Sequence, residues 1–119
     1  MKRVLFVDDE RSVLVALERM LRPHRERWDM LFAEGGVEAL AELEHRPVDV
    51  VVTDMRRPGM SGAALLEIVR ARHPDTIRIM LSGEVDPEGV AGIAELAHLR
   101  LHKPCDSDAI VGALDGAGA

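Results

Sequence analysis

Short apolar runs in this chain end repeatedly on a residue that can do chemistry. Four runs show the pattern: Val4–Val7 is followed by Asp8 and Asp9, Val50–Thr53 by Asp54, Ile77–Leu81 by Ser82, and Leu99–His102 by Lys103. Apolar runs of this length are typical of strands in a parallel sheet that is buried on both faces. The carboxyl ends of such strands open onto one crevice. The sequence therefore predicts that these five side chains lie together at one edge of a sheet.

The segments between these runs have the apolar spacing of helices. A further strand is predicted at Leu31–Ala33. The predicted helices cover about Glu10–Arg22, Gly36 to Arg46 with Val37, Leu40, Ala41 and Leu43 as apolar positions, Ser61 to His73, a segment that begins at Asp86, and about Asp106–Leu114. Strict alternation of strand and helix predicts an α/β fold with right-handed crossovers and helices on both faces of the sheet.

Length and composition predict one small intracellular domain over residues 1–119, ordered to about residue 115, with 116–119 as a frayed tail. The net charge of −6 argues against non-specific binding of nucleic acid or a membrane surface. A single cysteine excludes an internal disulfide and suits a reducing compartment. No apolar run has the length of a membrane span, and no signal peptide is recognisable, so we expect a cytoplasmic protein.

The acids allow two interpretations. Asp8, Asp9 and Glu10 could simply place negative charge at the start of the first helix, where the helix dipole favours it. Asp54 at the end of a different strand favours the other interpretation, because three converging carboxylates repel one another unless a cation lies between them. Mg²⁺ binds through a few carboxylates together with waters and phosphate oxygens. We therefore expect a Mg²⁺ site, which Mn²⁺ could also fill.

The chain resembles the receiver domain of bacterial two-component response regulators over its whole length. The matching motifs are Asp8-Asp9-Glu10, Thr53-Asp54 followed by Pro58-Gly59-Met60-Ser61-Gly62, Ser82-Gly83, and Lys103-Pro104. The resemblance implies a flavodoxin-like (βα)5 three-layer sandwich, with a five-stranded parallel sheet in the order 2-1-3-4-5. It also implies a phosphoacceptor domain that switches conformation to control an output domain or a partner protein.

The resemblance assigns a role to each motif. Asp54 would accept a phosphoryl group from a histidine kinase or a phosphotransfer protein. Asp8, Asp9, Asp54 and the backbone carbonyl of Arg56 would hold Mg²⁺, while Ser82 and Lys103 would bind oxygens of the phosphoryl group. The domain would catalyse only its own phosphorylation and dephosphorylation, rather than act as an enzyme on other substrates. A homodimer through the face made by the fourth helix, fifth strand and fifth helix is a further implied partner.

Two positions depart from the family pattern, and two others are expected to control how fast phosphate is lost. The position three residues before Lys103, where receivers usually carry a switching aromatic side chain, is Arg100, and Arg57 stands where an apolar residue is common. The resemblance implies that Arg56 and Glu84 flank the path of the hydrolytic water. We expect these two opposite charges to pair across the mouth of the site and to slow the loss of phosphate.

Three other functional classes are compatible with parts of the sequence. Asp8 and Glu10 have the spacing of an aspartyl-nucleophile phosphatase, although that class gives Asp54 no role and needs additional structural elements. A carrier of flavin mononucleotide would share the fold, but Asp8 and Asp9 would repel its phosphate. A receiver-like module that binds partners without phosphorylation is the third alternative, against which the complete acid set argues.

Overall fold

The computed structural model describes residues 1–54, 60–82, 97–102 and 106–118, with only the backbone described for Ser82 and His102. The elements are, in chain order, β1 (Lys2–Val7), α1 (Arg11–Leu21), a 3-10 turn η1 (Arg22–His24), β2 (Trp28–Ala33), α2 (Gly36–His45), β3 (Val50–Asp54), α3 (Gly62–Arg72), β4 (Ile77–Ser82), β5 (Leu99–His102) and α5 (Ser107–Gly116). The helix expected from Asp86 lies outside the described residues.

The five strands form one parallel sheet in the order β2-β1-β3-β4-β5. β1 is an interior strand and pairs with both β2 and β3, with Val7 opposite Ala33 on one side and Thr53 on the other. This register aligns the carboxyl ends of β1 and β3, so the residues that follow them emerge side by side. The predicted fold class and strand order are confirmed.

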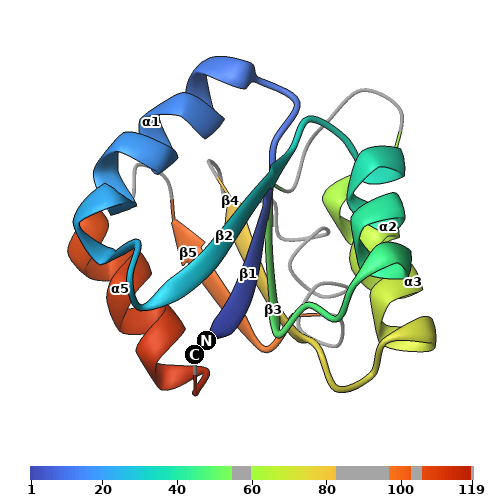
Figure 1. Cartoon of the computed structure of the whole chain (residues 1–119). Helices are drawn as coiled ribbons and strands as arrows, with labels where there is room; N and C mark the ends of the chain where they lie inside the picture. The colour runs from blue at the N-terminus through green and yellow to red at the C-terminus, as the bar shows by residue number, and fades with distance from the viewer. Residues whose placement is uncertain (55–59, 83–96, 103–105, 119) are drawn as a thin grey trace.

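Alternate residues of the strands pack into two apolar cores, one on each face of the sheet. Val4 and Phe6 of β1 face the core made with α1 and α5, whereas Leu5 and Val7 face the core made with α2 and α3. Figure 1 shows α1 and α5 together on one side of the sheet and α2 and α3 on the other. The strands are buried on both faces, as their continuous apolar runs predicted.

Several boundaries differ from those expected. β2 begins at Trp28 rather than Leu31, because its first residues pair with Lys2–Val4 of β1. Val37 was expected on the apolar face of α2 but is 70% exposed, and Ala39 and Leu43 are the side chains that the helix buries. At the chain end, α5 continues to Gly116 and Ala117 packs against the core. The fraying expected over residues 116–119 stays a prediction.

His98 extends the pairing of β4 with β5 by one residue. Its backbone N–H donates to the carbonyl of Arg78 at 2.8 Å, and its ring Nδ1 accepts from the Arg78 N–H at 3.0 Å. Burial, with a smaller contribution from the Arg78 charge, lowers the pKa of His98 below its ordinary value of 6.5. The Nδ1 atom can accept this bond only while it is unprotonated, so the bond belongs to neutral His98.

None of the helices in the described part of the chain combines the length and apolar character that a membrane crossing requires.

Candidate functional site

Three carboxylates meet at the carboxyl edge of the sheet. Asp8, Asp9 and Asp54 each offer an oxygen atom, and these atoms lie within 4.8 Å of one another. Asp8 and Asp9 follow β1, and Asp54 is the last residue of β3. The pairing of Val7 with Thr53 brings these strand ends together. The structure thus joins the acids that the sequence placed on separate strands.

Hydrogen bonds with its neighbours fix Asp8 at this edge. Its backbone N–H donates to the carbonyl of Ala33 at 3.1 Å, which continues the β1–β2 pairing by one residue. Its Oδ1 accepts from the N–H of Glu10 at 2.9 Å, which turns the chain into α1. The side chain is nearly inaccessible, with 2% exposure, whereas Asp9 is exposed.

Asp54 lies at the end of β3 and is half-buried, so its carboxylate is more accessible than that of Asp8. The preceding residue, Thr53, is fully buried, and its hydroxyl donates to the backbone carbonyl of Asp54 at 3.1 Å. This strand end is therefore held in place by sheet pairing on both sides and by a local hydrogen bond. A rigid strand presents a reactive group more reproducibly than a loop does.

The interpretation of the acids as helix-dipole partners does not account for the cluster. α1 begins at Arg11, and its first turn contains no acidic residue. Asp54 belongs to another strand altogether, yet it contributes an oxygen to the same group as Asp8 and Asp9. Oxygen donors of this kind, one of them buried, suit a hard divalent cation such as Mg²⁺. The residues present fit the ion that the sequence suggested.

A family model for the response regulator receiver domain matches residues 4–115. This chain belongs to the response regulator receiver domain family.

Curated relatives of this receiver are transcriptional regulators. It is 41% identical over 93 residues to the hydrogenase transcriptional regulatory protein HoxA of Cupriavidus necator, a match that covers 77% of this chain and 19% of HoxA. It is 35% identical over 115 residues to the DNA-binding transcriptional regulator NtrC of Salmonella typhimurium, covering 96% of this chain and 24% of NtrC. The receiver thus spans about a fifth to a quarter of the lengths of these relatives.

Solved receiver domains share its fold. The signal receiver domain of an HD domain-containing protein from Pseudomonas fluorescens superposes with a TM-score of 0.90 at 30% identity, covering 98% of this chain and 93% of that one. The chemotaxis protein CheY4 of Vibrio cholerae superposes with a TM-score of 0.88 at 28% identity, covering 98% of each chain. The family resemblance proposed from the motifs is confirmed.

The remaining predicted site residues of the receiver are described to different extents. Ser82 ends β4, one residue after Leu81, which lies opposite Asp54 in the sheet register, so its backbone is next to the acid cluster. Lys103, Arg56 and Glu84 lie outside the described residues, as does Arg57. The roles expected for these residues, including the pairing of Arg56 with Glu84, stay predictions.

Arg100 occupies the expected switch position in β5. It lies opposite Met80 in the sheet register and is half-buried. Met80 packs in the core of the α2 and α3 face, so Arg100 lies on that face of the sheet. Because Arg100 is a long cationic side chain, no aromatic ring can rotate at this position. One strand, β4, separates Arg100 from β3.

A close approach of α2 to the segment after Asp54 was not foreseen from the sequence. A Cβ atom added to Gly36 would lie 2.5 Å from the Met60 sulfur and 3.0 Å from its Cβ and Cγ atoms. Met60 belongs to the Pro58-Gly59-Met60 motif and packs partly buried on the core beneath α2 and α3. A glycine at the start of a helix is one sequence signal of such a close approach.

Proposed function

We propose that this receiver accepts a phosphoryl group on Asp54, in a Mg²⁺-dependent reaction with the phosphohistidine of a histidine kinase or a phosphotransfer protein. The observation that carries the proposal is the cluster of Asp8, Asp9 and Asp54 at one sheet edge in a member of the receiver family. Asp54 is the proposed acceptor because it projects from a rigid strand end and is more accessible than Asp8.

The proposed step is a displacement at phosphorus. A carboxylate oxygen of Asp54 forms the new bond to phosphorus, and the bond from phosphorus to the donor imidazole nitrogen breaks. The electron pair stays on that nitrogen, and the product is an acyl phosphate. Because the transition state of phosphoryl transfer is loose, the protein contributes mainly position and charge.

The neighbouring residues have complementary proposed roles. Bound Mg²⁺ would neutralise phosphoryl oxygens, and Asp8, Asp9, Asp54 and the carbonyl of Arg56 would hold it. The hydroxyl of Ser82 would donate a hydrogen bond to the phosphoryl group, and Lys103 would pair with one of its oxygens. Movement of Ser82 toward the new charge would start the conformational switch. The receiver would then catalyse only its own phosphorylation and dephosphorylation.

The phosphatase alternative is less well supported by the geometry. It requires Asp8 as the nucleophile, but Asp8 is 2% exposed and one of its oxygens already accepts the Glu10 N–H. A buried, hydrogen-bonded carboxylate is a poor nucleophile toward a phosphoester that must approach in line. Asp54, in contrast, has no role in that mechanism.

The output of the whole protein is inferred only from its relatives. HoxA and NtrC are named as transcriptional regulators, and this chain corresponds to a fraction of each. We propose that the receiver controls an output domain or a partner protein in the cytoplasm. With a net charge of −6, the receiver itself is poorly suited to binding nucleic acid.

The test is phosphorylation with acetyl phosphate and Mg²⁺, followed by intact-mass analysis. We expect the wild type to gain one phosphoryl group and Asp54→Asn to gain none. Omission of Mg²⁺ should abolish the gain, and Asp9→Asn should slow it without moving its position. Equal labelling of wild type and Asp54→Asn would refute the assignment. A wild type that takes up no phosphate with Mg²⁺ present would favour the phosphorylation-independent module.

A further inference from the structure

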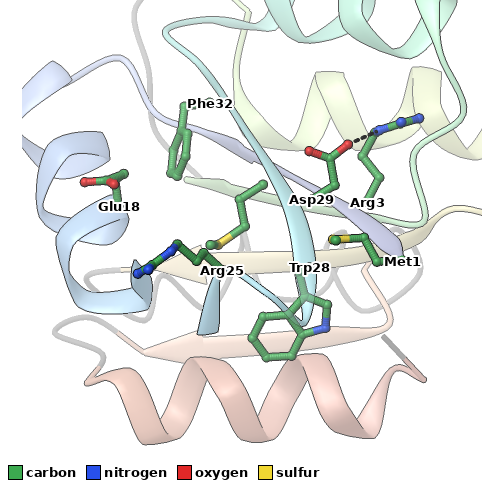
Figure 2. A pocket seen from close by; sticks show the side chains of 8 residues that line it. Met1, Arg3, Glu18, Arg25, Trp28, Asp29 and Phe32 are labelled. Atoms are coloured by element: carbon green, nitrogen blue, oxygen red, sulfur yellow. Dashed lines mark hydrogen bonds and ion pairs between the residues drawn. The ribbon is translucent and has the colours of Figure 1, made fainter. Parts of the chain in front are cut away.

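The outer edge of β2 lies in an open hollow on the surface. β2 is the terminal strand of the sheet, and within the described residues no strand pairs with its outer side. The hollow has a volume of about 510 Å³, and its walls include Glu18, Arg25, Trp28, Asp29, Met30 and Phe32. Figure 2 shows Glu18 and Phe32 on one side of β2 and the ion pair of Arg3 with Asp29 on the other. Residues from both faces of the sheet line one hollow, so the hollow surrounds the strand edge itself.

A second hollow continues the first along β2. It has a volume of about 270 Å³, shares Glu18 and Phe32 with the first, and extends to Arg11 and Glu34. Val15 of α1, which is 44% exposed, contributes to its wall. The two hollows together form a groove beside β2 that runs from the start of the strand to just beyond its end, between the strand and α1.

The groove carries opposite charges at its two ends. Arg25, which precedes β2, is exposed, and its guanidinium donates only a long bond of 3.4 Å to the carbonyl of Arg22 in the described structure. Glu34, which follows β2, is exposed, and its contact with Arg11 is loose at 3.8 Å. Between them the strand presents Met30, Leu31 and Phe32, all partly buried. The edge therefore has Arg25 before the strand, an apolar middle and Glu34 after it, while Asp29 near the start is paired with Arg3.

We propose that the β2 edge is an interface with a second copy of this chain, in which the two β2 strands pair antiparallel about a two-fold axis. In an antiparallel arrangement the start of each strand lies against the end of the other. Arg25 of each copy then approaches Glu34 of the other copy, which gives two such ion pairs in the dimer. A two-fold axis perpendicular to the sheet keeps both α1 helices on the same face, and the two grooves then meet. The outward backbone N–H and C=O groups of an edge strand supply the hydrogen bonds of the pairing.

This charge pattern favours a second copy over an unrelated extended peptide. A strand that is complementary to itself when reversed needs no other partner, whereas a peptide would have to carry the matching charges at both ends. The inference is independent of the proposed phosphotransfer, because it uses none of the acids at the carboxyl edge of the sheet. It also differs from the implied dimer, whose face includes β5, because β5 and β2 are at opposite ends of the sheet.

The test combines two charge reversals. Sedimentation velocity of the unphosphorylated wild type, from about 1 μM to about 1 mM, should show a concentration-dependent shift from 13.1 kDa to twice that mass. Arg25→Glu and Glu34→Arg should each raise the dissociation constant at least about tenfold, because each brings like charges together twice. An equimolar mixture of the two variants should dimerise as well as the wild type, since every contact in that heterodimer is again between opposite charges.

Glu67→Arg is the matched control. Glu67 is exposed on α3, on the other face of the sheet, and the substitution changes the net charge as Glu34→Arg does. We expect it to leave the dissociation constant within about twofold of the wild type. A wild type that stays monomeric at every concentration would overturn the proposal. A dimer that persists in Glu34→Arg, or single variants whose mixture stays monomeric, would overturn it as well.

Discussion

Replacing Gly36 with alanine should disturb the segment that follows Asp54. The added methyl carbon would lie 2.5 Å from the Met60 sulfur and 3.0 Å from its Cβ and Cγ atoms, far inside van der Waals contact. The sulfur can rotate away, but Cβ moves only with the backbone of residue 60. We therefore expect Met60 to leave its place against the core beneath α2 and α3.

The expected cost combines two opposing effects. Forcing an extra carbon into a filled space costs about 1–3 kcal/mol. Alanine also restricts the unfolded chain, which stabilises the folded protein by about 0.4–1 kcal/mol at a compatible position. The balance is a loss of about 1–2 kcal/mol in the free energy of unfolding, together with a displaced Met60.

Gly112→Ala is the matched control for this substitution. Gly112 is an interior, exposed residue of α5, and an added Cβ atom there would meet nothing within 4 Å. The same chemical change should therefore stabilise the protein by about 0.5–1 kcal/mol, the helix-propensity difference between the two residues.

Urea denaturation followed by tryptophan fluorescence measures both effects. The chain has one tryptophan, Trp28, which is 1% exposed and reports unfolding of the core. Each kcal/mol moves the midpoint by roughly 0.3–1 M urea, so the two variants should move it in opposite directions. If Gly36→Ala is as stable as Gly112→Ala, the close approach of α2 to Met60 does not limit this site.

Two further predictions concern charge. Asp9→Asn should weaken Mg²⁺ binding, measured by calorimetry, at least ~10-fold, because replacing even a residue that only supports a metal ligand costs about that much affinity. The metal-free protein should unfold at no lower urea concentration, since one of three mutually repelling charges has been removed. Clear destabilisation with unchanged affinity would make Asp9 a structural residue. Because the folded-state pKa of His98 is lowered, the unfolded chain binds the proton first, and stability should fall as the pH drops from about 6.5 through that folded-state pKa. His98→Asn, which offers the Arg78 N–H an acceptor that does not titrate, should reduce this slope; an unchanged slope would show that the Nδ1 bond does not contribute to it.

The sequence alone was sufficient to predict the sheet and the meeting of the acids. Continuous apolar runs indicate strands buried on both faces, and parallel strands end at the same edge, so Asp8, Asp9 and Asp54 had to converge. The family motifs supplied the strand order, which periodicity does not contain. The strands and the convergence of the acids follow from local sequence patterns, which each segment of the chain carries by itself.

The tertiary structure decided how far each element extends and which side chains are covered. β2 reaches back to Trp28 because β1 offers it backbone partners, although Asp29 interrupts the apolar pattern there. Val37 is apolar yet exposed, since the rotation of α2 over the sheet directs Ala39 and Leu43 inward instead. The sequence pattern reports only the polarity of residues along the chain, whereas burial depends on which surfaces of the folded elements contact each other.

The same limit applies to the site and its surroundings. Asp8 and Asp9 are adjacent and chemically identical, but the hydrogen bond of Asp8 with Ala33 draws it into the interior while Asp9 stays exposed. The contact of Gly36 with Met60 and the groove along β2 also join residues from different elements. Such contacts exist only after the chain has folded, because distances between elements are set by the packing of the whole core.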